Sequence, residues 1–209
     1  PHRDFGGIHC HIGSQILDTE GFHEAGKSMA DKALEVKRQT GQFPAMINMG
    51  GGFGIMYTKE DNPLPVVRMT DAIRLGMDEV LLPAGESIPI VAIEPGRFIG
   101  GEAGITLYTV LSVKDVPGVR KFVAVDGGMA DNPRVTMYQA KYDCAIANKA
   151  ALPAQETVSI AGRCCETDML IYDIELPVAE YGDTVAFFAT GAYNHAMAGN
   201  YNQLPIPPV

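Results

Sequence analysis

The chain has 209 residues, of which 46% are hydrophobic and 20% charged, and it contains no tryptophan. This is the composition of a globular protein with one large or two modest domains, and it excludes disordered, collagen-like and disulfide-stapled chains. A formal net charge of −9 leaves no basic face for a phosphate backbone, so we expect no nucleic-acid partner. No run of 18 apolar residues occurs, so we expect no membrane span. Small-molecule chemistry is the expectation that remains.

The start of the chain and its cysteines indicate a compartment. The sequence opens Pro-His-Arg-Asp, without a start methionine and without the regions of a signal peptide, so we expect a cytoplasmic protein and an excised piece of a longer one. The cysteines have neither the CxxC spacing of zinc sites nor the density of a secreted scaffold. We therefore expect free thiols at Cys10, Cys144, Cys164 and Cys165.

The first hundred residues alternate between two hydrophobic periods. Short apolar runs at 5–11, 46–49 and 89–93 predict strands. Apolar residues at helical spacing predict a helix between Thr19, as N-cap, and Gly41, and a second helix that begins at Thr70. This alternation predicts a parallel sheet and part of a TIM-type β/α barrel, most of which would precede Pro1 because a closed barrel needs about 250 residues.

The pattern changes after residue 100. The runs 105–113, 121–125, 157–161 and 184–189 are rich in β-forming residues, with no comparable helices between them. We therefore predict an α/β protein with two domains, a partial barrel over residues 1–100 and a mostly antiparallel β domain over 101–209.

Two tempting motifs do not fit their context. Residues 21–28, GFHEAGKS, match the phosphate-loop pattern, but they lie inside the first predicted helix rather than between a strand and a helix. His9 and His11 are two apart on a predicted strand, so they would point to opposite faces and could not chelate one metal. We expect neither a nucleotide loop nor a metal site.

Chemically useful residues follow each predicted strand of the first half. These segments read HCHIGSQ at 9–15, GGGFG at 50–54 and EPGR at 94–97. The carboxyl ends of barrel strands form one rim, so the three segments should converge. Consecutive glycines allow close backbone approach and an anion nest, while Glu94 could keep a heteroaromatic nitrogen protonated and Arg97 could bind a carboxylate or phosphate. The alternatives are a plain turn and a surface ion pair.

The second half repeats this arrangement. VDGGMADNPR at 125–134 and GRCCETD at 162–168 each follow a predicted strand. A cysteine beside acids is a plausible proton donor, because its thiol is neutral at pH 7 and easily ionised. The alternative is a structural pair of cysteines.

Six motifs occur in one order: HCHIGSQ, MGGGFG, EPGR, VDGGMADNPR, AGRCCETD and TGAYNHAMAGNYN. This order closely resembles the diaminopimelate decarboxylases over residues 5–202. The resemblance implies an alanine-racemase-like barrel that binds pyridoxal 5'-phosphate and a C-terminal β domain. It also implies decarboxylation of meso-2,6-diaminopimelate to L-lysine and CO2.

The resemblance also implies roles for individual residues. Cys165 would be the catalytic acid that protonates the α-carbon. The implied cofactor-binding residues are His11, Ser14, the glycines at 50–52 (Gly51 and Gly52 above all), Glu94, Gly96, Arg97 and Tyr193. The implied substrate-binding residues are Arg97, Arg134, Tyr138, Glu166 and Tyr193.

Three further expectations come with the resemblance. The Cys165 segment would reach the active site across a homodimer interface. No lysine stands in the Tyr-Ala-x-Lys-Ala context of the family's Schiff-base lysine, so we expect a C-terminal fragment that is inactive alone. The alternatives are an ornithine, arginine or carboxynorspermidine decarboxylase and a non-catalytic cofactor-binding relative; Glu166 and Arg134 favour a substrate with a second amine and carboxylate.

Overall fold

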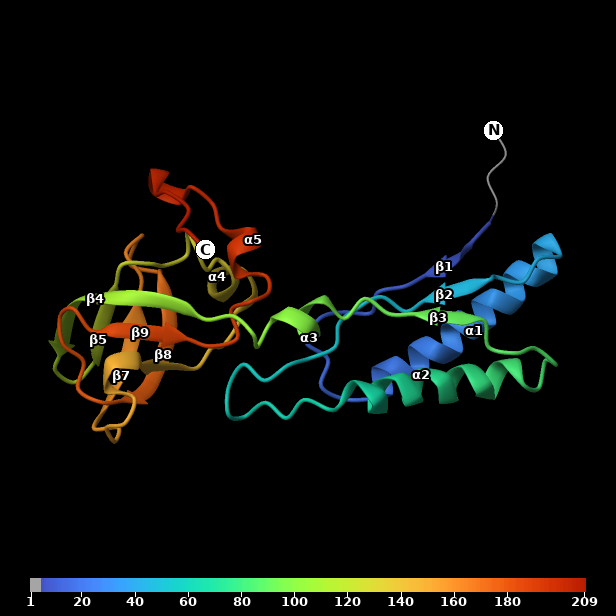
Figure 1. Ribbon diagram of the computed structural model, residues 1–209, viewed down its shortest axis with the longest axis horizontal. Coiled ribbons are helices and arrows are strands. Elements are labelled where there is room, and N and C mark those ends of the chain that lie inside the picture. Colours follow the sequence, from blue (N-terminus) through green and yellow to red (C-terminus); the bar gives the residue numbers. More distant parts are fainter. Residues whose placement is uncertain (1–4) are drawn as a thin grey trace. The chain divides into compact units, whose positions relative to one another are not determined.

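The computed structural model describes residues 5–209. They form two compact units, the first made of residues 5–55 and 61–99 and the second of residues 56–60 and 100–209. Each unit has its own sheet (Figure 1). The α/β fold class predicted from the sequence is confirmed, with a parallel β/α part followed by a mostly antiparallel part.

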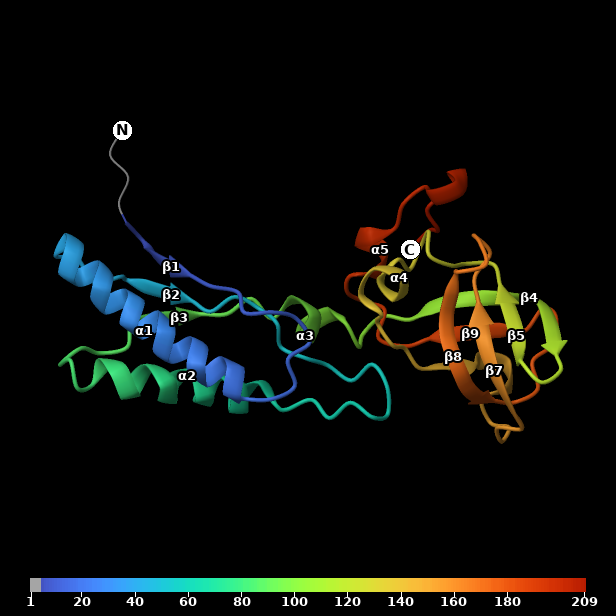
Figure 2. The same ribbon diagram turned by 180° about the vertical axis from the view of Figure 1, so that it is seen from behind.

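The first unit alternates strands and helices. Its three strands pair in parallel in the order β1-β2-β3, so their carboxyl ends lie at one edge. Figures 1 and 2 show the two long helices side by side along the sheet. The elements are β1 (Gly7–His9), α1 (Glu20–Thr40), β2 (Met46–Asn48), α2 (Val66–Leu81) and β3 (Ile90–Ala92), followed by the short helix α3 (Gly96–Gly100).

The two long helices meet at a pair of glycines. A Cβ on Gly26 would lie 2.5 Å from the carbonyl oxygen of Ile73, and one on Gly76 would meet the carbonyl oxygen of His23. Both glycines therefore let the helix backbones approach closely. Gly26 also belongs to the GFHEAGKS segment, and its place inside α1 confirms the prediction that this segment is helical.

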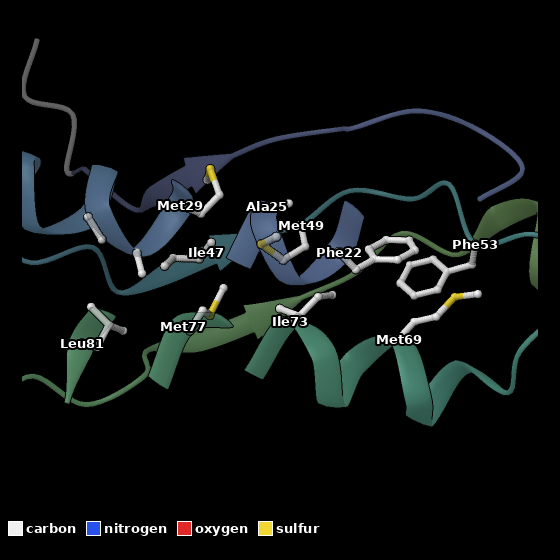
Figure 3. Close-up of a cluster of buried hydrophobic side chains, with 12 residues drawn as sticks. Phe22, Ala25, Met29, Ile47, Met49, Phe53, Met69, Ile73, Met77 and Leu81 are labelled. Carbon is white, nitrogen blue, oxygen red and sulfur yellow. The ribbon is translucent and has the colours of Figure 1, made fainter. Parts of the chain in front are cut away.

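Apolar side chains from both helices and from β2 form the core of the first unit (Figure 3). The rings of Phe22 and Phe53 stack with centroids 4.8 Å apart. The helical spacing that predicted α1 is the spacing of its buried face, because every third or fourth side chain meets the sheet. The buried side chains labelled in Figure 3 are Phe22, Ala25, Met29, Ile47, Met49, Phe53, Met69, Ile73, Met77 and Leu81.

The helix ends differ in part from the expectations. Gly41 adopts φ 77° and ends α1, as predicted. Thr19 occupies the N-cap position, but its side chain makes no capping hydrogen bond. α2 begins at Val66 rather than Thr70, because Pro65 holds φ at −55° and its carbonyl accepts the N–H of Arg68, which closes the first turn.

The second unit is a six-stranded sheet in the order β6-β9-β4-β5-β7-β8, in which β5 and β7 alone pair in parallel among the described strands. Short helices α4 and α5 lie near each other in both views (Figures 1 and 2). The strands are β4 (Thr106–Val116), β5 (Arg120–Val125), β6 (Cys144–Ile146), β7 (Glu156–Ala161), β8 (Met169–Leu176) and β9 (Thr184–Phe187). The helical segments are α4 (Arg134–Tyr138), η1 (Ala147–Lys149), α5 (Asn194–Met197) and η2 (Tyr201–Gln203).

Two of these strands carry no clear sequence signal. β6 has three residues, which is too short for a detectable alternation. β8 contains Asp173 at φ 52°, and its pairing with β7 shifts register near this residue. The irregularity breaks the period of two along β8, so the strand does not alternate between buried and exposed residues.

Candidate functional site

In the first unit, the three strand ends converge. Hydrogen bonds continue the parallel ladder beyond the strands: the N–H of Cys10 donates to the carbonyl of Asn48, and that of Met49 to the carbonyl of Ala92, each at 2.9 Å. The N–H of Glu94 then donates to the carbonyl of Gly50 at 2.7 Å. The histidine, glycine and glutamate segments therefore meet at one edge of the sheet, as the barrel argument predicts.

The glycines at 50–52, which we call the glycine cradle, allow backbone segments to approach more closely than side chains would permit. A Cβ on Gly51 would lie 2.5 Å from the carbonyl oxygen of Glu94, and a Cβ on Gly52 would lie 2.5 Å from that of Gly13. Gly50 and Gly52 adopt φ 69° and 97°, which residues with side chains rarely do. The segment is therefore a fixed close approach of backbones and not a plain flexible turn.

His11 is an exposed side chain held against this cradle. The N–H of Gly51 donates to its Nδ1 atom at 3.2 Å. A ring nitrogen that accepts a hydrogen bond carries no proton, so this contact assigns the N–H of the ring to Nε2. The ring of His11 is thereby oriented beside the glycines. His9 belongs to β1 but His11 lies beyond its end, so the expectation of opposite strand faces does not apply to this pair.

Glu94 is oriented by a residue that the sequence reasoning missed. The side-chain amide of Asn48 donates to Oε1 of Glu94 at 2.7 Å, and its carbonyl oxygen accepts the N–H of Gly50 at 2.8 Å. Nε2 of His9 lies 3.7 Å from the same carboxylate oxygen. The available signal was the position of Asn48, the last residue of β2, directly before the glycine segment.

Arg97 and Ser14 come together from two different strand ends. Nη2 of Arg97 donates to Oγ of Ser14 at 2.8 Å. Gly96 begins α3, and its N–H donates to the carbonyl of Glu94 at 2.8 Å, so the EPGR segment turns sharply after β3. A hydroxyl and a guanidinium are suited to bind a phosphate, whereas the N–H groups of Gly50 and Gly51 already donate to Asn48 and His11.

In the second unit, Arg134 lies in a cage of aromatic rings. Its Nη1 atom donates to the hydroxyls of Tyr57 at 2.7 Å and Tyr142 at 2.9 Å, and its guanidinium carbon lies 5.1 Å and 5.9 Å from their ring centroids. Arg134 is 6% exposed, so the cage encloses nearly all of it. One nitrogen of the guanidinium is thus fixed by two tyrosine hydroxyls.

This cage could not be read from the sequence motif. Burial raises the pKa of Tyr142, whose hydroxyl is also within 3.2 Å of the side-chain nitrogen of Asn194. Arg134 is 77 residues from Tyr57 and 8 residues from Tyr142 in the chain. No local spacing links residues at such separations.

The four cysteines are free thiols in different environments. Burial raises the pKa of Cys10 and raises that of Cys144 to about 12. Burial, followed by a hydrogen bond to the Asp168 carboxylate, raises the pKa of Cys164. Cys165 is the exposed one, with its Sγ 3.0 Å from Oγ1 of Thr167. It is therefore the thiol that a reactant can reach most easily.

The remaining expected site residues lie on the surface of the second unit. Glu166 follows Cys165 and is exposed. Tyr138 ends α4 and is 61% exposed, and Tyr193 precedes α5 and is 44% exposed. The N–H of Gly199 donates to the carbonyl of Ala130, and the Asn202 side chain donates to the carbonyl of Cys164 at 3.0 Å. The three motifs of the second half are thus linked within this unit.

Within residues 5–209, none of the helices combines the length and the apolar character that a membrane span requires. Nor do three or more His, Cys, Asp and Glu side chains gather there in a way that could hold a metal ion.

Comparison with known proteins shows what this chain is similar to. Residues 2–101 match the family described as pyridoxal-dependent decarboxylase, pyridoxal binding domain. The diaminopimelate decarboxylase of Bacillus subtilis is 50% identical over 209 residues, which cover 100% of this chain and 48% of that protein. That of Bacillus methanolicus is also 50% identical, over 97% of this chain and 47% of its own length. The chain therefore spans about half the length of these relatives.

Solved structures agree with the sequence relatives. The diaminopimelate decarboxylase of M. jannaschii, solved in co-complex with L-lysine, matches with a TM-score of 0.83 and 37% identity over 94% of this chain and 44% of that one. The enzyme of Helicobacter pylori, also complexed with L-lysine, matches with a TM-score of 0.80 and 31% identity over 94% of this chain and 46% of that one.

Proposed function

The chain belongs to the pyridoxal-dependent decarboxylases, and from this premise we propose that its protein is a carboxy-lyase that converts meso-2,6-diaminopimelate to L-lysine and CO2. The observation that carries the proposal is the convergence of the glycine cradle, His11 and Glu94 at one edge of the parallel sheet. The likeness to diaminopimelate decarboxylases supports the choice of substrate.

The residues of the first unit fit pyridoxal 5'-phosphate. Gly51 and Gly52 let the backbone lie directly against the carbonyls of Glu94 and Gly13. Ser14 and Arg97 add a hydroxyl and a cation beside them, which suits the phosphate. The exposed ring of His11, oriented by Gly51, suits contact with the face of the pyridine ring. Gly96 holds the sharp turn that presents Arg97.

Glu94 would hold a proton at the pyridine nitrogen. When bound, pyridoxal 5'-phosphate supplies an electron sink for the electron pair that the departing carboxylate leaves behind. A carboxylate at that nitrogen keeps it protonated and strengthens this sink. Asn48 fixes one oxygen of Glu94 by its 2.7 Å hydrogen bond, so the carboxylate does not need to reorganise during the reaction.

The residues of the second unit would recognise the substrate and return the proton. Arg134, which is 6% exposed and held in its aromatic cage, would bind a carboxylate, which Tyr138 and Tyr193 could also contact. Glu166 suits the distal amine of the substrate. Cys165 would donate the proton that replaces the carboxylate at the α-carbon, since it is the exposed thiol.

The assembly and location follow the family resemblance. We infer a homodimer in which Cys165 and Glu166 of one protomer serve the cofactor site of its partner. Their exposure on the second unit is compatible with this arrangement. Four free thiols are typical of a reducing compartment, which supports a cytoplasmic location.

The test is a substrate comparison on the complete protein, because the chain spans about half the length of its relatives. The purified protein, loaded with pyridoxal 5'-phosphate, is supplied separately with meso-diaminopimelate, ornithine, arginine and carboxynorspermidine. We expect L-lysine and CO2 from the first substrate and little turnover of the others. Putrescine from ornithine as the sole product would refute the proposal in favour of the ornithine-type reading. Binding of the cofactor without any turnover would favour a non-catalytic relative.

A further inference from the structure

A buried carboxylate closes the loop that carries Cys165. This loop runs from the end of β7 to the start of β8, and Asp168 is its last residue. Asp168 is 1% exposed. Its Oδ1 accepts the N–H of Met129 at 2.8 Å and its Oδ2 accepts the N–H of Cys164 at 2.9 Å. One side chain therefore joins the cysteine loop to the loop that follows β5.

The backbone of Asp168 closes the same loop. Its carbonyl accepts the N–H of Gly162 at 2.6 Å, and its own N–H donates to the carbonyl of Cys165 at 3.1 Å. Together with the two hydrogen bonds of the carboxylate, these contacts hold the loop where its two ends meet, at Gly162 and Asp168, and at Cys164, the residue before the exposed thiol. Hydrogen bonds to an ionised acceptor are about twice as strong as neutral ones, so this is a rigid attachment.

Two glycines make room for this carboxylate. A Cβ built on Gly128 or on Gly162 would fall on the Asp168 side chain. Gly128 belongs to the loop after β5 and Gly162 to the cysteine loop, so both loops are shaped around the same group. Close packing on both sides, together with nearly complete burial, leaves the carboxylate one position.

We propose that Asp168 is a positioning residue for the decarboxylation, acting through the loop that presents the thiol of Cys165 and the carboxylate of Glu166. The inference rests on the proposed function. Asp168 touches no reacting atom itself. It fixes the backbone at Cys164, while the 3.0 Å contact between Cys165 Sγ and Thr167 Oγ1 orders the thiol within the same loop. An acid held in this way can deliver its proton to one face of the substrate carbon.

The variant Asp168→Asn tests the attachment at nearly constant volume. An amide has one accepting oxygen, so its NH2 group would face the N–H of either Cys164 or Met129, and one bond would be replaced by a repulsive contact. The matched control is Asp173→Asn. Asp173 lies on β8, and its carboxylate accepts Nε and Nη2 of Arg120 at 3.0 Å, with no hydrogen bond to the cysteine loop.

The first measurement is amide hydrogen exchange in the complete, cofactor-loaded protein. We expect peptides that contain Cys164 and Met129 to exchange faster in Asp168→Asn than in wild type, and to be unchanged in Asp173→Asn. Equal protection in all three proteins would overturn the inference. This readout does not need activity, so it separates the role of Asp168 from the proposed reaction.

The second measurement is the stereochemistry of the product. Decarboxylation in D2O places one deuterium on the carbon that loses CO2, and a fixed acid places it at one of the two prochiral positions. We expect a single label position in wild type and in Asp173→Asn, and a mixture of the two positions in Asp168→Asn. We also expect kcat of Asp168→Asn to fall about 100-fold, because a misplacement of a reacting group by about 1 Å costs this much in rate. Wild-type kcat with a single label position in Asp168→Asn would overturn the positioning role.

A second variant covers the case in which Asp168→Asn does not fold. Gly162→Ala keeps the charge and places a methyl group against the Asp168 carboxylate. We expect the same loss of protection and the same mixed labelling, and wild-type behaviour would overturn the inference. If wild type itself does not decarboxylate meso-diaminopimelate, the proposed function fails and the positioning role fails with it, while the exchange data still show whether Asp168 anchors the loop.

Discussion

Tyr142→Phe removes one hydroxyl from the cage around Arg134 and leaves the ring. The ring keeps its edge-to-face contact with Tyr57, at 5.3 Å between centroids, and its position beside the guanidinium. Arg134 loses its 2.9 Å hydrogen bond, and Asn194, which is 4% exposed, loses its side-chain partner. The variant therefore isolates the contribution of polar contacts in the cage.

The expected loss of stability follows from these contacts. A hydrogen bond to a charged group contributes about 1.5–3 kcal/mol, and a buried amide left without a partner costs about 1–3 kcal/mol. Arg134 retains its bond to Tyr57, so we take the lower part of each range. We expect the free energy of unfolding to fall by about 2–4 kcal/mol.

The assay is urea unfolding followed by circular dichroism, together with the Michaelis constant for meso-diaminopimelate. The control is Tyr172→Phe. Tyr172 is 57% exposed and also lies under an arginine, Arg120, at 5.1 Å, so its change should cost less than about 0.5 kcal/mol. We expect Tyr142→Phe to raise KM more than it lowers kcat, because the role proposed for Arg134 is to bind a carboxylate and not to move a proton. A stability loss equal to that of the control would refute the reasoning.

Three further predictions concern catalysis and pH. Cys165→Ala should lower kcat by about 10²- to 10⁴-fold and leave the cofactor absorbance unchanged. The control Cys164→Ala should change kcat only slightly. Unchanged turnover of Cys165→Ala would remove this thiol from the mechanism. Glu94→Gln should lower kcat by about 100-fold, and an equal rate would show that another group serves the pyridine nitrogen. Burial of Asp183 opposes its ionisation, but hydrogen bonds from Lys149 and Asn148 outweigh this effect and lower its pKa. Hydrogen bonds to Asp183 and Glu180 in turn raise the pKa of Lys149. The pair therefore stabilises the fold at neutral pH, and its contribution decreases as pH falls below about 4 or rises above about 10.5. Asp183→Asn should lower the melting temperature at pH 7, and its difference from wild type should shrink steadily as pH falls below about 4.

Local patterns in the sequence were sufficient for the parts of the fold that depend on neighbouring residues. The helix from Glu20 to Thr40 has a 3.6-residue period and ends at Gly41, and both features are properties of one short segment. The same holds for the strands of the first unit, each followed by polar or glycine residues. The meeting of these segments at one edge could be inferred too, because parallel strands share a carboxyl end.

The tertiary structure decided the contacts between residues that are far apart in the chain. Asn48 and Glu94 are 46 residues apart, and Asp168 and Met129 are 39 apart, so no spacing rule relates them. The sequence carries no signal for β8, because a residue at positive φ breaks its alternation. The resemblance implies a substrate-binding role for Arg134, but no sequence pattern indicates that this residue lies at the centre of an aromatic cage. A sequence pattern records which face of an element is apolar, whereas the partner of a buried polar group depends on which elements pack together, and that is settled only by the folded chain.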